Sequence, residues 1–359
     1  MRRFFECLIP TTACNLRCSY CYLIQENRRK GEPAIFRYSP EIIGKGLSQK
    51  RLGGVSLISM TASGETFLPP ELPSIAREIL KQGHYINITT NGTLTKQIQK
   101  LLQYTESYHS HIHMSFSFHY IELKERGLLD TFFENIKMVK AAGCSILLQI
   151  NLVDEYVPYW EEIKTLSIRH TGALPQVALT RDETSGTYKI LSGMTREQYE
   201  SIGNEMKSPL FNCTCENFMV KRHEYCYAGL WSAKLNLGTG IMSACYGHGM
   251  VQNIFEDINK PIIFEPIGKN CPFQYCFNSS HFISQGIIPE LRDIPSYGEL
   301  RNREEAEWYT NDMKTFLYQK FEDTNPLLSN LRKSFYSLRK SYWNVKHKAK
   351  QVISNISDK

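Results

Sequence analysis

The sequence predicts an α/β fold: a partial (β/α)6 barrel, followed by a small cysteine-rich C-terminal module and a helical tail. Six apolar, β-rich runs alternate with helix-like segments over about the first 180 residues, a pattern that favours right-handed crossovers and a parallel sheet. Cysteine, glycine and aromatic residues then gather after residue 208, and the last segment is basic with helical spacing. We therefore divide the chain into 1–207, 208–285 and 286–359.

The predicted strands are short apolar segments, each followed by helix or turn signals. They are residues 4–10, 55–60, 85–90, 113–118, 145–153 and 175–180. Ser39 is a good N-cap for the helix before the second strand, because Pro40 then occupies its first position. Further helices are expected near 70–81, 93–104, 158–170 and before Gly143. In barrels of this type, chemistry takes place at the C-terminal ends of the strands.

Composition narrows the class of protein. The chain has 359 residues, a net charge of +6 and 11 cysteines, an odd number that argues against a closed disulfide framework. The apolar start is interrupted by Glu6 and Pro10, so it is not a signal peptide. No apolar run approaches the roughly 18 residues that span a bilayer. We expect a cytoplasmic protein without a nucleic-acid partner, whose clustered cysteines serve metal binding or catalysis.

Three cysteines follow the first predicted strand within eight residues: Cys14, Cys18 and Cys21. A structural zinc ion needs four ligands, and no fourth lies nearby in the sequence. A thioredoxin-like pair would leave Cys14 unused. A 4Fe–4S cluster has four corners, so three protein thiolates leave one iron open to a substrate or cofactor.

The spacing C-x-x-x-C-x-x-C, with aromatic Tyr20 before the last cysteine, resembles the radical S-adenosylmethionine (SAM) superfamily. The resemblance implies that the open iron of the [4Fe-4S] cluster binds SAM and that one electron cleaves it. The resulting 5′-deoxyadenosyl radical then abstracts a substrate hydrogen. It also implies an electron donor of the flavodoxin or ferredoxin type, and it places Tyr20 near the adenine.

Further segments resemble this family in the expected order. The stretch "ASGET" contains Ser63, Gly64 and Glu65 and resembles the Gly-Gly-Glu-Pro segment that binds the SAM amino group. "ITTNGT" follows the third strand, as in many members. The resemblance implies that Ser115 or Ser117 meets the SAM ribose or carboxylate. Weaker candidates are Gln149, Asn151 and Arg181 for cofactor binding, and His119 as a general base or a hydrogen-bonded structural histidine.

A second set of cysteines consists of Cys226, Cys245, Cys271 and Cys276. The sequence around them resembles the auxiliary-cluster modules called SPASM and, in shortened form, twitch. That resemblance implies a second, auxiliary [4Fe-4S] cluster with four protein ligands. By spacing alone, the same four thiolates also suit zinc. Cys213 and Cys215 are unassigned and either replace a ligand or are free thiols.

The tail, residues 326–359, carries eight Lys or Arg residues and one acidic residue. Its apolar residues recur at helical spacing: Leu331, Phe335, Leu338, Tyr342, Val345 and Val352. One interpretation is an amphipathic helix that contacts an acidic partner or a membrane surface. The other, which we favour from the sequence, is a helix that packs this apolar stripe on the barrel.

The two enzyme hypotheses differ in the class of substrate. An auxiliary cluster beside a radical site suits oxidation or bond formation on a peptide or protein side chain. The alternative is oxidation of a carbohydrate or aminocyclitol alcohol, as in twitch-type dehydrogenases. The sequence begins directly at the first predicted strand, which counts against a peptide-recognition domain before it. A third hypothesis, from another class, is a non-catalytic iron–sulfur or zinc protein.

Overall fold

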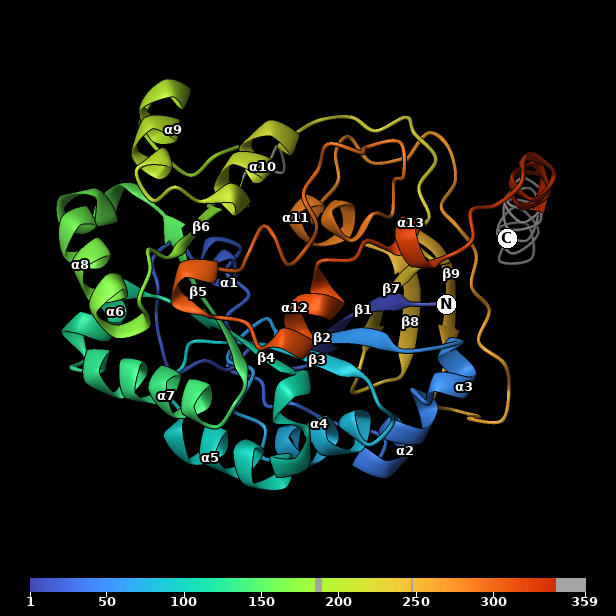
Figure 1. Cartoon of the computed structure of the whole chain (residues 1–359), viewed down its shortest axis with the longest axis horizontal. Helices are drawn as coiled ribbons and strands as arrows, with labels where there is room; N and C mark the ends of the chain where they lie inside the picture. The colour runs from blue at the N-terminus through green and yellow to red at the C-terminus, as the bar shows by residue number, and fades with distance from the viewer. Residues whose placement is uncertain (185–188, 247, 340–359) are drawn as a thin grey trace, which may run out of the picture.

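One nine-stranded sheet organises the computed structural model, which describes residues 1–184, 189–246 and 248–339. Its order is β6-β5-β4-β3-β2-β1-β7-β8-β9 (Figure 1). The first six strands pair in parallel in sequence order, which confirms the predicted partial barrel. They are β1 (Arg3–Ile9), β2 (Ser56–Ala62), β3 (Tyr85–Thr90), β4 (Ile112–Ser117), β5 (Ser145–Leu152) and β6 (Gln176–Leu179).

Helices fill the crossovers and lie along the outside of this half-barrel (Figure 1). The longer ones are α2 (Pro40–Gly46), α4 (Leu72–Leu80), α5 (Thr95–Tyr104), α7 (Leu129–Ala141) and α8 (Trp160–Thr171). Shorter ones are α1 (Tyr22–Gln25), α3 (Gln49–Leu52), α6 (Tyr120–Glu125), η1 (Glu106–His111) and η2 (Asp154–Tyr159). The predicted cap of α2 is confirmed, because Ser39 Oγ accepts from the Ile42 N–H at 3.4 Å.

The cysteine-rich region extends the barrel's own sheet. Strand β7 (Ser232–Asn236) pairs in parallel with β1, and β8 (Ile241–Cys245) and β9 (His248–Asn253) follow in antiparallel pairing. Two helices, α9 (Arg196–Asn204) and α10 (Pro209–Asn217), precede them. Ser208 caps α10 through its side chain, and Pro209 starts the helix.

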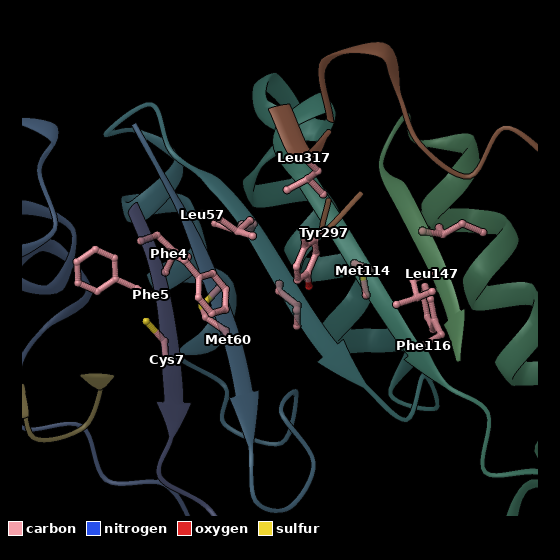
Figure 2. Close-up of a cluster of buried hydrophobic side chains, with 14 of the residues drawn as sticks. Phe4, Phe5, Cys7, Leu57, Met60, Met114, Phe116, Leu147, Tyr297 and Leu317 are labelled. Atoms are coloured by element: carbon pink, nitrogen blue, oxygen red, sulfur yellow. The ribbon is translucent and has the colours of Figure 1, made fainter. Parts of the chain in front are cut away.

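The segment after the cysteines returns to the barrel. It contains α11 (Ser279–Phe282), η3 (Ile283–Gln285), η4 (Glu304–Ala306), α12 (Asn311–Leu317) and α13 (Phe321–Thr324). The buried guanidinium of Arg303 donates to carbonyls near β6, including Leu174 at 3.0 Å. Tyr297 packs against Phe4 of β1 with ring centroids 6.4 Å apart, and Figure 2 shows it among side chains of the barrel strands. This segment therefore belongs to the core.

The tail differs from the favoured expectation. Residues 330–339 are helical, but Leu331, Phe335 and Leu338 are exposed and do not pack on the barrel. The reason is that the helix turns another face to the protein, with Lys333 over the Tyr225 ring. Tyr342, Val345 and Val352 lie outside the described residues. None of the helices in the described ranges is long and apolar enough to cross a membrane.

Several buried or half-buried histidines are uncharged at pH 7. Burial lowers the pKa of His113 to about 3 and that of His119 to about 4, and it lowers the pKa of His281 and His84 as well. Neither ring nitrogen of His113 has a hydrogen-bond partner of normal geometry among the described residues. Because these pKa values are depressed, the unfolded chain binds protons that the folded chain does not, once the pH falls below about 6.5.

We therefore predict that stability declines as the pH falls from 7 to 5, and that His113→Phe reduces this decline. One such histidine costs up to about 2 kcal/mol at pH 5 relative to pH 7. Thermal or urea unfolding at several pH values measures the effect. His223→Phe, at an exposed histidine, is the matched control. Identical pH slopes in the His113 and His223 variants would contradict the assignment.

Candidate active site

A cavity of about 470 Å³ lies at the C-terminal ends of the barrel strands. Nearly all the residues predicted for the site line this cavity, although they come from the ends of five different strands and the loops that follow them. They are Cys14, Cys18, Tyr20, Cys21, Ser63, Gly64, Glu65, Ser117, His119, Gln149, Asn151 and Arg181. Ser115 lies deeper on β4, where its hydroxyl donates to Asn87 Oδ1 at 2.8 Å. Of the two serines on this strand, the geometry thus favours Ser117 for ligand contact.

The loop with the first three cysteines is held against the neighbouring strand ends. The Gly64 N–H donates to the Thr11 carbonyl at 2.9 Å, and the Glu65 N–H donates to the Ala13 carbonyl at 2.8 Å. A Cβ at Gly64 would lie 1.9 Å from the Ala13 oxygen, so only glycine fits at this position. The "ASGET" segment therefore clamps the backbone just before Cys14.

The "ITTNGT" segment supports the same loop from the other side. Asn91 donates to Asn15 Oδ1 at 2.8 Å, and Asn15 donates to Thr93 Oγ1 at 2.7 Å. The Asn91 amide also lies 3.9 Å from the sulfur of Cys14. No role was predicted for this segment, and the structure shows that it braces the cysteine loop.

Glu65 is buried and fully hydrogen bonded within the protein. Its carboxylate accepts from Thr90 Oγ1 at 2.6 Å, from the Asn91 N–H at 2.8 Å and from the Phe67 N–H at 3.0 Å. Burial raises the pKa of Glu65, and these three hydrogen bonds counteract the rise. The carboxylate thus joins the ends of β2 and β3 beneath the cysteine loop.

Tyr20 and His119 form one hydrogen-bonded unit in the cavity wall. The Tyr20 hydroxyl lies 2.6 Å from His119 Nδ1 and 3.1 Å from the Tyr156 hydroxyl. Since burial lowers the pKa of His119 to about 4, the imidazole is neutral at pH 7. Tyr156, from the turn after β5, was not predicted, because nothing in its local sequence marks it as a partner of Tyr20.

Arg181 links the barrel to the cysteine-rich region. Its guanidinium donates to the Phe277 carbonyl at 3.0 Å and pairs with Glu183 at 2.9 Å. Asn151 donates to Thr180 Oγ1 at 3.2 Å on the neighbouring strand. Arg181 therefore lines the cavity, while the ion pair with Glu183 also holds its guanidinium.

The second set of thiols lines another, smaller cavity of about 30 Å³. Cys226, Cys245, Cys271 and Cys276 all lie on its wall. Cys213 and Cys215 lie elsewhere on α10, where Cys213 packs with Leu210 and Leu300. Cys7 and Cys144 are buried in the core. All four auxiliary thiols thus line the smaller cavity, and the other cysteines do not.

Neither thiol set converges on a single point. Among the described residues, no three Cys, His, Asp or Glu side chains are placed to hold one metal ion. A tetrahedral zinc site needs all sulfurs at about 2.3 Å from one centre. An iron–sulfur cluster holds its ligands farther apart, because the cluster itself occupies the space between them. The donor chemistry, thiols around a cavity, fits such a cluster at both places.

The two cavities share a wall. Tyr246, Tyr275, Cys276, Phe277 and Asn278 line both of them.

Buried Glu6 of β1 holds this wall in place. It accepts hydrogen bonds from the Tyr246 hydroxyl and, at 3.2 Å, from the Asn278 amide. Glu6, Tyr246 and Asn278 were not predicted as site residues from the sequence. The positions of Tyr246 and Asn278, within two residues of predicted ligands, were the available signal.

Comparison with known families identifies the first part of the chain. Residues 8–164 match the family model described as the Radical SAM superfamily. These residues are therefore a radical SAM domain, and they contain the cysteine loop and most of the cavity wall. No curated protein matches the chain significantly.

Several solved structures resemble the chain at low identity. Streptococcus suis SuiB bound to S-adenosylmethionine is 17% identical with a TM-score of 0.49, over 71% of this chain and 64% of SuiB. anSMEcpe with AdoMet and the Cp18Cys peptide is 13% identical with a TM-score of 0.48, over 72% and 78%. BtrN with AdoMet and 2-DOIA is 14% identical with a TM-score of 0.36, over 92% of each chain. The chain thus spans less than two thirds of SuiB.

We predict that Gly64→Ala prevents assembly of a cluster at the first cysteine set. The added methyl group would overlap the Ala13 carbonyl and displace the backbone that precedes Cys14. We expect the iron bound by this set after anaerobic reconstitution to fall about tenfold, since a single methyl overlap at this distance must move the loop. Iron analysis and absorbance spectra measure it.

The matched control is Gly193→Ala, where the nearest atom to a new Cβ lies 3.4 Å away in the Asp154 side chain. This variant is expected to bind iron as the unchanged chain does. Equal iron in the Gly64 and Gly193 variants would show that the clamp does not position the cysteines.

Proposed function

We propose that this chain is a radical SAM enzyme that oxidises, or forms a bond on, a peptide or protein side chain. The observation that carries the proposal is the shared wall between the cavity with Cys14, Cys18 and Cys21 and the cavity with the four auxiliary thiols. A substrate in the first cavity would thus lie next to an auxiliary [4Fe-4S] cluster. Such a cluster can accept the electron that an oxidative reaction releases.

Each part of the cavity wall has a proposed task. Cys14, Cys18 and Cys21 would hold a [4Fe-4S] cluster, and Ser63, Gly64, Ser117, Gln149, Asn151 and Arg181 would surround SAM. When bound, these groups supply a 5′-deoxyadenosyl radical that abstracts hydrogen, after reduction by a flavodoxin- or ferredoxin-type donor. Glu65 acts through the loops it joins, because its carboxylate is already satisfied by the protein.

His119 was proposed from the sequence as a general base. Its 2.6 Å hydrogen bond to Tyr20 supports a positioning role better. An imidazole whose pKa is about 4 is a weak base, so it would take a proton from a substrate poorly. We therefore propose that His119 fixes the Tyr20 ring on the cavity wall, beside the place of the adenine.

A groove next to the cavity favours an extended substrate over a small sugar. It has a volume of about 330 Å³ and its wall includes Ile190, Met194, Phe218 and Met219. Phe218 lines both the groove and the cavity, so the two adjoin. A peptide can place one side chain in the cavity and lay its neighbouring residues along apolar groove walls. A carbohydrate or aminocyclitol would use the cavity alone.

Loss of a thiol from the first cysteine set is predicted to affect the reaction differently from loss of a thiol from the auxiliary set. With SAM and dithionite, Cys14→Ala should lose 5′-deoxyadenosine formation by about a thousandfold or more, because an incomplete cluster cannot reduce SAM. Cys271→Ala should retain this formation but lose about half of the bound iron and all substrate oxidation. Chromatography of the nucleoside and iron analysis measure both.

Cys213→Ala serves as the control for both variants, since its thiol lies outside the two cavities. If the reconstituted, unchanged chain forms no 5′-deoxyadenosine, the non-catalytic interpretation as an iron–sulfur or zinc protein would replace the enzyme proposal.

The groove gives a test of the substrate class. Met219→Glu places a charge on the apolar groove wall, and we expect it to raise KM for a peptide substrate about tenfold. SAM cleavage without substrate should not change, because Met219 lies outside the cavity. Ile168→Glu on α8, also at an exposed apolar residue, is the control. A carbohydrate that is turned over equally by both variants would favour the alternative substrate class.

A further inference from the structure

The helix at residues 330–339 presents an uncovered apolar stripe. Leu331, Phe335 and Leu338 are 84%, 57% and 72% exposed. Their spacing of four and three residues places them on one face of the helix. Figure 1 shows this helix at the edge of the molecule, beyond α13. Three large apolar side chains together on one exposed helix face indicate an interaction surface rather than a random surface composition.

The opposite face of the helix holds it to the protein. The Lys333 ammonium lies 4.7 Å from the centre of the Tyr225 ring, and Arg339 forms an ion pair with Glu265 at 3.0 Å. Lys333, Tyr336 and Arg339 are half-buried, while the residues between them are exposed. Polar and cationic contacts thus fix the helix with its apolar face outward, and the stripe is not available to the barrel.

Positive charge accompanies the stripe. Arg332 is exposed beside Leu331, and only Asp358 is acidic among residues 326–359, against eight Lys or Arg residues. In the sequence beyond residue 339, Tyr342, Val345 and Val352 continue the apolar spacing. Lysines occur in the same stretch at 340, 346, 348 and 350. The pattern is that of an amphipathic helix with a basic polar face.

We propose that the helix at residues 330–339 binds the surface of a bilayer that contains anionic phospholipid. The exposed stripe would enter the boundary between headgroups and acyl chains, and the basic residues would meet the phosphates. A second copy of this chain is disfavoured as the occupant, because the two strongly basic tails would repel each other. An acidic protein partner would pair with the basic residues, but it would not explain why three apolar side chains are exposed on one face of the helix.

Co-sedimentation of the full-length protein with vesicles tests this inference. The probe is phosphatidylcholine vesicles that contain roughly a third phosphatidylglycerol, with pure phosphatidylcholine vesicles for comparison. We expect binding to the anionic vesicles that weakens with added salt. The combined change Leu331→Ser, Phe335→Ser and Leu338→Ser should weaken it about tenfold or more. Its 5′-deoxyadenosine formation should not change, since these residues lie outside the cavity.

The matched control is Ile35→Ser, Ile168→Ser and Val251→Ser, which removes three aliphatic side chains that are 72%, 52% and 62% exposed elsewhere. Equal binding by the two triple variants, or no binding by the unchanged chain, would overturn the proposal. A dimer that only the stripe variant loses would assign the surface to a second copy instead. Slower reduction by an acidic flavodoxin, without vesicle binding, would assign it to a protein partner.

Discussion

The buried carboxylate of Glu65 is the interaction on which the site depends. Taking a carboxylate out of water is costly unless it is hydrogen bonded, and Glu65 accepts from Thr90, Asn91 and Phe67. The donors belong to the ends of β2 and β3, so one charge fixes both loops. The backbone N–H of the same residue donates to Ala13, in the loop that carries the first cysteines. The position of the thiols is therefore set by a charge that lies below them.

Much of the half-barrel was predictable because its signals are local. Each strand is a short apolar run, and the cap at Ser39 and the three-cysteine spacing are readable within a few residues. Contacts between segments that are far apart in the sequence leave no such local signal. Phe4 of β1 pairs with Ser232 of β7, and Ile146 of β5 donates to the carbonyl of Trp308. Hence neither the extension of the sheet nor the return of the C-terminal segment was foreseen.

The difference between local and long-range signals also explains which parts of the site were predicted from the sequence. The cysteines were found from spacing, and nearly all the proposed SAM contacts line one cavity. The shared wall was missed, since Glu6, Tyr246 and Asn278 come from three distant segments that only the fold brings together. The tail shows the opposite limit: periodicity identified the apolar stripe correctly, but not which face meets the protein. Contacts of Lys333 and Arg339 decide that, and they depend on tertiary structure.

Strand β1 connects the two thiol sets physically. Its C-terminal end leads directly into the loop with Cys14, while Glu6 in its middle holds Tyr246 and Asn278, which follow Cys245 and Cys276 closely in the sequence. The Asn278 amide also donates to the Tyr246 hydroxyl at 3.1 Å, so the three side chains form a closed set of hydrogen bonds. A buried polar set of this kind is rigid when every member is satisfied. The separation of the two cavities is thus fixed by one strand rather than by a flexible contact between modules. Such a fixed separation is what a reaction would need if it starts at one thiol set and releases its electron to the other.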